Sequence, residues 1–412
     1  MPSAFNFSVD SFSISDNCGG IPWELHDYAF RMGRPLDHPG DVPGTVGVYG
    51  IGMKRAIFKI GGDCLISTQN KDFRYEVEIA SDWVENDKTW RFPVKSSKKT
   101  MPEDGTTIVV GNLNSGVANN FSQGKESFET TLVRLISTHF AFIIEKGLKV
   151  TVNGVKVDPR PTKLIFSKQK FGKEGRSIKP FIFQSESDGV KIFLVVGLTR
   201  PIPSQAELSK GLVESRYSAL EAGWTIVCNE RAVVSCDRTE LTGWGESGVP
   251  RFHNQFIAIS GVVDFRSDNA ANLPTNTTKR GIDGSSILYL QVKNKMREGM
   301  RIFTEYTNRW KGRENEAKKQ IESEEPISIE EIREISGELP MTTTKRTIPQ
   351  GNQYTPILPQ PVRPQPTKAR IAFVKDLKDV DKVADYLFGS SDVGPSEVGE
   401  ECFDRMLKEA KK

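Results

Sequence analysis

The chain has 412 residues, of which 56 are Lys or Arg and 53 are Asp or Glu, so its formal net charge is only +3. This length gives room for two or three domains, and the balanced charge excludes a strongly basic protein whose whole surface attracts nucleic acid. Five cysteines without a C-x-x-C pair and four scattered histidines exclude the common zinc motifs.

The cysteine count and the hydropathy pattern indicate where in the cell the protein is located. An odd number of cysteines without paired spacing favours a reducing, intracellular environment. No stretch approaches the roughly 20 apolar residues that a membrane span needs, and the first ten residues, MPSAFNFSVD, lack the basic and apolar regions of a signal peptide. We therefore predict a cytoplasmic protein with no membrane partner.

Residues 1–157 are predicted to form a mixed sheet with helices on one face. Phe5 and Phe7, then Phe12 and Ile14, alternate with polar residues, which is typical of two short strands whose aromatic rings belong to a core. Further strands are predicted in the segments DCLIST, FRYEVEIA, WRFPVK and GTTIVVGNL. Helices are predicted at residues 22–32, 52–60 and 126–146, a Gly/Pro-rich loop at 33–49, and a hairpin around Asn153-Gly154.

A second α+β domain is predicted at residues 158–313, with strands in KIFLVVGL, GWTIVCNERAVVSC and FIAISGVVDF and a long helix from about residue 282 to beyond 310. Residues 314–370 read as a charged helix followed by a Pro-rich linker, and 371–412 as a small helical module. The expected fold class is therefore α+β.

A glycine-punctuated run, GTVGVYGIGMKRAIFKIG, occupies residues 44–61. It is not a P-loop, because Met53 stands where that motif needs Lys, and it is not the dinucleotide fingerprint, because Arg55 stands where a small residue is required. Its glycines still allow backbone amides to approach a ligand beside the N-terminus of the following helix.

Three motifs follow one another: SISDNCGGIP at residues 13–22, the glycine run, and DGTTIVV at residues 104–110. In this order they resemble the Bergerat-fold or GHKL ATPases, the superfamily of gyrase B, ninety-kilodalton heat-shock chaperones, histidine kinases and MutL, and most of all its MORC-like and chaperone-like branch. The segments AGWTIVCNERAVV and LPTNTTKRGID resemble the transducer domain of MutL and type II topoisomerases. The resemblance implies a Bergerat α/β sandwich, truncated at its N-terminus, followed by a transducer domain of ribosomal-S5-like βαβ type.

The resemblance assigns base recognition to three residues. Asp16 would accept a hydrogen bond from the adenine amine, which guanine cannot offer, and Gly20 would let the backbone come close. Thr106 would bind the base or a bridging water.

The resemblance also assigns residues to the phosphates. Residues 33–49 would be a lid, while Gly47, Gly50 and Gly52 would cradle the phosphates with the next helix N-terminus, and Lys54 would add a nearby charge. Lys279 would reach the γ-phosphate from the transducer domain as a sensor. ATP and Mg²⁺ are the implied cofactors.

The sequence departs from the family pattern at its start. The family has an earlier helix with a Glu that activates water and an Asn that holds Mg²⁺, whereas residues 1–15 contain no Glu and their single Asn, Asn6, lies in a predicted strand. Cys18 stands where the family usually has Gly. No general base is identified and the metal ligands are not assigned, so this chain is a possible ATPase whose hydrolysis of ATP stays open. A start annotated too late, a degenerate paralogue and a piece of a split protein are three explanations that stay open.

Three functional hypotheses follow. The first is an ATP-binding, nucleotide-gated clamp that forms a homodimer through its ATPase domains. The second is a non-enzymatic scaffold that keeps the fold for contacts with a protein client. The third is nucleic-acid handling, supported locally by the basic segments KGRENEAKK and TTKRG, which serve equally well as solvated surface.

Overall fold

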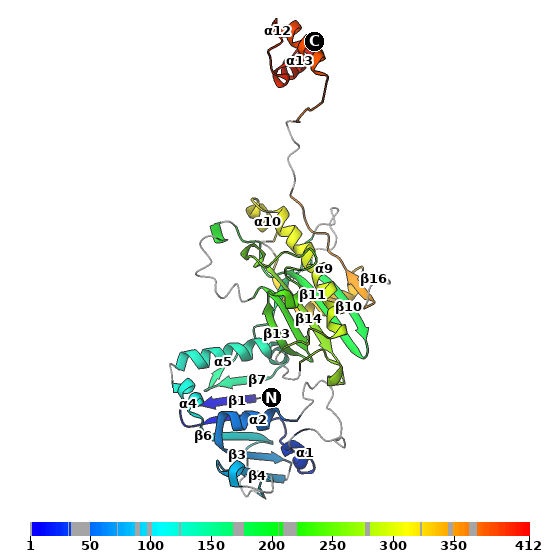
Figure 1. Ribbon diagram of the computed structural model, residues 1–412. Helices are drawn as coiled ribbons and strands as arrows, with labels where there is room; N and C mark the ends of the chain where they lie inside the picture. Colours follow the sequence, from blue (N-terminus) through cyan, green and yellow to red (C-terminus); the bar gives the residue numbers. More distant parts are fainter. Residues whose placement is uncertain are drawn as a thin grey trace. The chain divides into compact units, whose positions relative to one another are not determined.

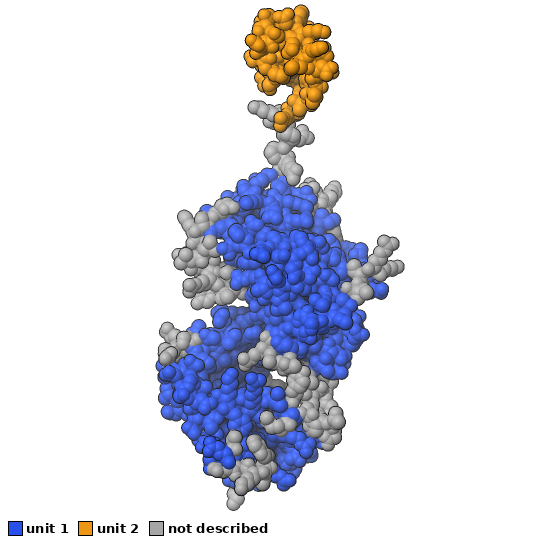
Figure 2. Space-filling model, viewed as in Figure 1, with its two compact units in different colours: residues 1–361 blue, residues 362–412 orange. Residues whose placement is uncertain are grey.

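The computed structural model divides the chain into two compact units, Met1–Pro361 and Val362–Lys412 (Figure 2). It describes residues 2–31, 33, 50–71, 73–86, 91–96, 101–122, 125–167, 177–204, 206–208, 221–276, 281–321, 324–344, 349–361 and 369–412. The larger unit contains two large sheets and the chain is of mixed α+β class, which confirms the predicted class. No helix in the described ranges has the length and apolar character needed to cross a bilayer.

The first sheet has eight strands in the order β5-β4-β3-β6-β2-β1-β7-β8. Neighbouring strands run antiparallel except β1 and β7, which run parallel. The strands are β1 (Pro2–Phe7), β2 (Phe12–Asp16), β3 (Gly61–Asn70), β4 (Phe73–Ile79), β5 (Val94–Ser96), β6 (Gly105–Leu113), β7 (Lys149–Val152) and β8 (Val155–Lys156).

Helices cover one face of this sheet (Figure 1). The register places Ile66 opposite Ile108 and Val77, and Ile14 opposite Ile108 and Phe5, so these apolar side chains share a face. That face packs against η1 (Trp23–Leu25), α1 (His26–Phe30) and α2 (Gly52–Ile60) on one half and α4 (Ser115–Ser122), α5 (Lys125–His139) and α6 (Ala141–Glu145) on the other. The short α3 (Trp83–Asn86) follows β4. The predicted placement of the helices on one face is thus confirmed.

The second sheet has seven strands in the order β13-β12-β14-β11-β10-β17-β16, and a small ladder joins β9 (Lys163–Ile165) to β15 (Pro326–Ser328). Its strands are β10 (Phe181–Ser187), β11 (Val190–Leu198), β12 (Gly223–Cys228), β13 (Arg231–Asp237), β14 (Ile259–Arg266), β16 (Thr342–Thr344) and β17 (Gly351–Tyr354). The predicted strands of this region correspond to β11, β12, β13 and β14.

Both faces of the second sheet are covered. Val263 packs in one apolar cluster with Met296 of α9 (Ile287–Arg309), whereas Val262 packs in the other with Ile332 of α11 (Ile329–Ile335). Since neighbouring residues of a strand point to opposite faces, the two helices lie on opposite sides of β14. Helix α10 (Glu314–Lys319) follows α9.

The segment predicted as a charged helix and a Pro-rich linker, residues 314–370, belongs to the larger unit up to Pro361 and is packed there. Strand β17 pairs antiparallel with β10, and α11 contributes Ile329 and Ile332 to a core cluster. The Pro-rich stretch is also held, because the Trp310 indole N–H donates to the Pro359 carbonyl at 3.3 Å. Backbone pairing at a sheet edge and one buried indole override the linker-like composition.

The smaller unit contains α12 (Leu377–Phe388) and α13 (Pro395–Ala410), where two helices were predicted. The predicted boundary at 157/158 falls between the two large sheets, but no division of the larger unit tests it, so it stays a prediction.

Candidate functional site

Three polar side chains meet at one end of the first sheet. Asp16, the last residue of β2, lies opposite Thr106 of β6, and Thr106 lies opposite Thr68 of β3. The hydroxyls of Thr68 and Thr106 are 3.1 Å apart and both residues are buried. The three residues are an even number of positions from Ile14, Ile108 and Ile66, so they lie on the helix-covered face.

The backbone at this end is packed so closely that two positions require glycine. A Cβ atom on Gly20 would lie 1.9 Å from the Gln69 carbonyl oxygen, and one on Gly105 would lie 2.0 Å from the Asp16 carbonyl oxygen. Gly20 also has φ +68°, in the left-handed region that glycine tolerates best. The glycines of the first and third motifs therefore bring the ends of three strands together.

The segment after Asp16 is tied to the neighbouring strand. The Ile21 amide donates to the Thr68 hydroxyl at 2.8 Å, and the Asn70 side chain donates to the Gly19 carbonyl at 2.5 Å. The Tyr75 hydroxyl donates to the Ile21 carbonyl at 3.1 Å. These bonds fix the position of the loop beside Asp16.

Asp16 itself shapes the turn that follows it. Its Oδ1 accepts a hydrogen bond from the Cys18 amide at 2.8 Å. Desolvation and the charge of Asp16 raise the pKa of the exposed Cys18 thiol, which keeps it protonated and disfavours a role as nucleophile. The turn thus occupies Oδ1, and the Cys18 thiol also donates a hydrogen bond to the Asp16 carboxylate.

The glycine run is described from Gly50 onward, and the predicted phosphate residue Gly47 lies outside the described residues together with the predicted lid, apart from Gly33. Gly50 has φ +64° and Gly52 begins α2. Ile51, at the N-cap position, is apolar and makes no capping hydrogen bond. The first amides of α2 thus donate no hydrogen bond to the side chain of their own N-cap residue, which suits a helix end that receives an anion.

Helix α2 runs directly into β3 and packs on it through Ile57. Because Ile60 is followed at once by the first residue of β3, the helix turns back over the strand and its N-terminus faces the end that carries Thr68. Phe30 of α1 and Tyr75 of β4 contact each other in the same cluster, with ring centroids 6.4 Å apart. The N-terminus of α2 and Asp16 therefore lie at the same end of the first sheet.

Lys54 does not point freely into solution. It is only 3% exposed, and its Nζ donates to the Ala29 carbonyl at 2.8 Å. Burial lowers the pKa of Lys54, and no carboxylate of the described residues lies within ion-pair distance of it. A buried ammonium group that donates to a neutral carbonyl has no negative charge to compensate its own. A nearby anion would therefore stabilise it.

The predicted γ-phosphate sensor Lys279 also lies outside the described residues, which stop at Asn276 and resume at Gly281. The two ends of this segment are joined, because Thr275 and Ile282 form an antiparallel bridge and the Asn276 amide donates to the Gly281 carbonyl at 3.1 Å. Its role stays a prediction.

No group of three or more His, Cys, Asp or Glu side chains that could hold a metal ion occurs in the described part of the chain. Mg²⁺ in nucleotide sites is usually held by one or two side chains and the phosphates, so the predicted Mg²⁺ stays a prediction.

Sequence reasoning missed Thr68, which links Thr106 to the loop after Asp16. A signal was present, because Cys64, Ile66 and Thr68 share the core face of one strand and only the last is polar. A polar residue on a buried face at a strand end needs a partner.

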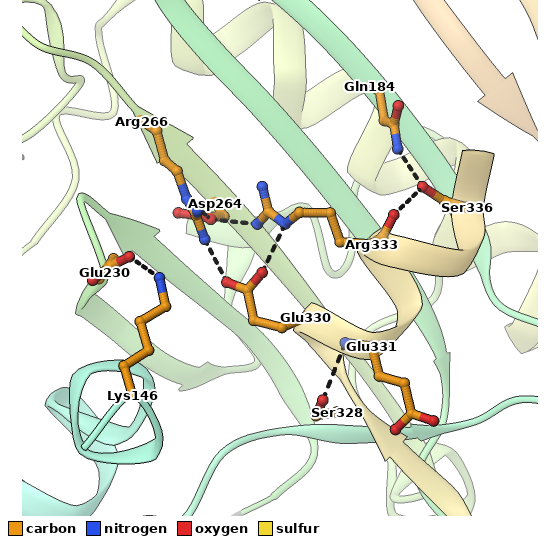
Figure 3. A network of polar contacts seen from close by, with 10 residues as sticks. All are labelled: Lys146, Gln184, Glu230, Asp264, Arg266, Ser328, Glu330, Glu331, Arg333 and Ser336. Atoms are coloured by element: carbon orange, nitrogen blue, oxygen red, sulfur yellow. Dashed lines mark hydrogen bonds and ion pairs between the residues drawn. The ribbon is translucent and has the colours of Figure 1, made fainter.

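Sequence reasoning also missed an ionic network on the second sheet (Figure 3). Asp264, whose side chain is 2% exposed, accepts from Arg266 at 2.6 Å and from Arg333 of α11. Glu330 pairs with both arginines. Two carboxylates and two guanidinium groups balance, so this network holds α11 on β14 and does not call for a charged ligand.

The first sheet is joined to the second through the end of its helical layer. His139 Nδ1 lies 2.5 Å from the Ala232 carbonyl oxygen, and Lys146 forms an ion pair with Glu230 (Figure 3). Phe142 packs in the core cluster that contains Ala232. The β12–β13 hairpin therefore contacts the ends of α5 and α6 through Glu230 and Ala232.

No protein-family model matches this sequence, and no curated protein matches it.

Proposed function

We propose that this chain binds ATP in the manner of the GHKL superfamily, with a Bergerat-type sandwich in the first sheet region and a transducer-type domain in the second. The observation that carries the proposal is the junction of Asp16 with Thr106 at one sheet end, where Gly20 and Gly105 admit close backbone approach. Its residues come from two of the motifs that suggested the superfamily.

The chemistry of the junction suits adenine. A carboxylate accepts a hydrogen bond from an exocyclic amine, whereas the carbonyl that guanine carries at that position would face it as a second acceptor. Asp16 Oδ1 is occupied by the Cys18 amide, so Oδ2 is the atom that would read the base. The paired hydroxyls of Thr68 and Thr106 would complete recognition directly or through water.

The phosphates would lie toward Gly50 and the N-terminus of α2. The uncapped amides of the helix supply donors, and Lys54 supplies a positive charge that lacks a counter-ion among the described residues. ATP normally carries Mg²⁺, which neutralises part of the triphosphate charge. We assign no protein ligand to that ion and propose no hydrolysis step. Homodimerisation through the ATPase domains is the family-based part of the proposal.

Calorimetry with ATP on the wild type and on Asp16→Asn tests the base assignment. Asparagine keeps an oxygen for the Cys18 amide but turns an NH₂ group toward the adenine amine, so we expect affinity to fall by about 1–3 kcal/mol, roughly 5- to 150-fold. The melting temperature without nucleotide should barely change, because the turn is retained. Unchanged ATP affinity in Asp16→Asn would refute the assignment.

One observation favours a second candidate, a scaffold that does not depend on nucleotide. Lys54 is bonded to Ala29 within the protein, which is what a purely structural lysine would do. Thermal unfolding separates the two candidates, since a ligand at 100 times its Kd adds about 2.7 kcal/mol of stability. No shift with Mg-ATP, ATP or ADP at millimolar concentration would favour the scaffold.

A further inference from the structure

The smaller unit leaves most of its large apolar side chains in contact with solvent. In residues 369–412 only Ala384 and Val398 are buried, while Tyr386 is 82% exposed, Met406 64% and Phe403 52%. A monomeric domain rarely exposes apolar side chains at this density unless they form an interaction surface.

The size of this unit leads to the same conclusion. Two helices of 12 and 16 residues form its secondary structure. Chains of this size bury too little apolar surface to be stable alone without disulfides, metals or association. Its one cysteine, Cys402, is free, and no metal-binding group occurs in the described residues. Association with a second apolar surface would supply the missing burial.

The apolar residues of α13 form one broad stripe, which is exposed except at the buried Val398 and the half-buried Cys402. Val398, Cys402 and Met406 follow one another at four-residue spacing, and Phe403 and Leu407 repeat that spacing beside them. Gly399 lies in the same stripe, and a Cβ atom there would meet nothing within 4 Å. Glycine inside a helix costs about 1 kcal/mol relative to alanine, and here it leaves room for a second helix to approach.

The charges of α13 show what kind of helix fits this stripe. Residues 395–404 contain four acidic and no basic side chains, whereas residues 405–412 contain four basic and one acidic. A second α13 in the opposite direction would place its basic half beside the acidic half of the first. A parallel copy would place like charges together. The helix is therefore complementary to itself in the antiparallel orientation.

We propose that the smaller unit is a self-association module in which α13 pairs antiparallel with α13 of a second copy of this chain. A two-fold axis near the middle of the helix makes the interface isologous, so each copy contributes Phe403, Met406 and Leu407. The pairing needs no nucleotide and is independent of the proposed ATP site.

Acidic residues near the N-terminus of α13 and basic residues near its C-terminus would also stabilise the helix through its dipole. Two charge-reversal variants separate this effect from pairing between two copies. Variant A carries Glu397→Lys, Glu400→Lys and Asp404→Lys, so that both halves of residues 395–412 have a net positive charge. Variant B carries Lys408→Glu, Lys411→Glu and Lys412→Glu, so that both halves have a net negative charge. A dipole effect would weaken the helix in each variant, and mixing A with B would restore nothing.

The measurement is the mass of the full chain by light scattering, without nucleotide and at about 100 µM, where a micromolar Kd is saturated. We expect the wild type at twice the 46.0 kDa of one chain, A alone and B alone at 46.0 kDa, and their equimolar mixture again at twice that mass. A control with Lys375→Glu, Lys378→Glu and Lys382→Glu makes the same charge change as B on exposed positions outside α13, and it should stay dimeric.

Three results would overturn the proposal. One is a wild type that is monomeric at this concentration, including a monomer whose α13 amides are protected from hydrogen exchange by the rest of its own chain. Another is a dimer that A and B each form as well as the wild type does. The third is a mixture of A and B that stays monomeric while both show the helix content of the wild type by circular dichroism.

Discussion

The two large sheets differ in what covers them. The second sheet has helices on both faces, and every residue of β12 is buried. The first sheet has helices on one face only, and on the other Leu65 and Val109 are more than one-third exposed. The second sheet is therefore buried between two layers of helices. The first sheet has three polar residues, Asp16, Thr68 and Thr106, together at one end of its strands.

The two sheets also differ in how their polar side chains are partnered. In the second sheet the buried carboxylate of Asp264 is paired with two arginines. At the Asp16 end of the first sheet the polar groups are held in place, but a carboxylate oxygen and the Lys54 charge lack ionic partners among the described residues. Substitutions should thus affect stability in one region and ligand affinity in the other.

The largest difference is expected between two leucines. Leu194 of β11 is fully buried and Leu65 of β3 is 38% exposed. Leu194→Ala should lower the free energy of unfolding by about 2–5 kcal/mol because it leaves a cavity, while Leu65→Ala should lower it by about 0.5 kcal/mol. Urea denaturation measures both, and equal losses would remove the contrast between the sheets.

Two adjacent glycines sharpen the comparison within the first sheet. Both have positive φ, but a Cβ atom on Gly19 would meet nothing within 4 Å, whereas one on Gly20 would meet Gln69 at 1.9 Å. Gly19→Ala should cost about 1–2 kcal/mol of backbone strain, and Gly20→Ala about 2–5 kcal/mol because overpacking adds to it. Similar losses in thermal unfolding would show that the strand ends can separate.

Acid should weaken the second sheet through Glu330. Burial acts to raise the pKa of Glu330, but the charges of Arg333 and Arg266 outweigh it and lower the pKa overall. A carboxyl whose folded pKa lies below its unfolded value, about 4.3, contributes stability at higher pH that is lost as pH falls through the folded pKa.

Glu330→Gln should therefore be less stable at pH 7 and show a flatter loss of stability between about pH 5 and 3. Glu334→Gln, exposed on the same helix, is the control and should keep the wild-type profile. Identical acid profiles for the wild type and Glu330→Gln would contradict the stabilising role of the network.

The smallest effect on ligand affinity is expected at Lys54. Lys54→Met removes a buried charge near the proposed phosphates and should weaken ATP binding about tenfold, or roughly 1.4 kcal/mol. Lys59→Met, exposed at the other end of the same helix, should leave ATP affinity unchanged. If Lys54→Met binds ATP as the wild type does, its amino group serves only to hold Ala29.

Local patterns predicted the elements that depend on neighbouring residues. The alternation of apolar and polar residues from Phe5 to Ile14 predicted the β1–β2 hairpin, and the helical spacing of apolar residues after Gly52 predicted α2. Both periodicities can be recognised within a few consecutive residues. The adjacency of Asp16 and Thr106 followed from motif order and is present in the ladder.

Long-range pairing could not be predicted in the same way. Strand β17 has the polar sequence GNQY and joins the sheet by backbone bonds to β10, which lies more than 160 residues earlier. The contact between Trp310 and Pro359 likewise depends on tertiary folding. Thr68 was missed because its importance comes from the hydroxyl of Thr106 on another strand.

The discrimination between purines tests the central claim most directly. The ratio of ATP to GTP affinity should be measured by calorimetry for the wild type and for Asp16→Asn. The account predicts that the wild type prefers ATP by at least about tenfold, since GTP would leave a half-buried carboxylate facing a carbonyl, and that Asp16→Asn loses or reverses this preference. Equal affinities of the wild type for both nucleotides, or a preference for ATP that survives in Asp16→Asn, would contradict the account.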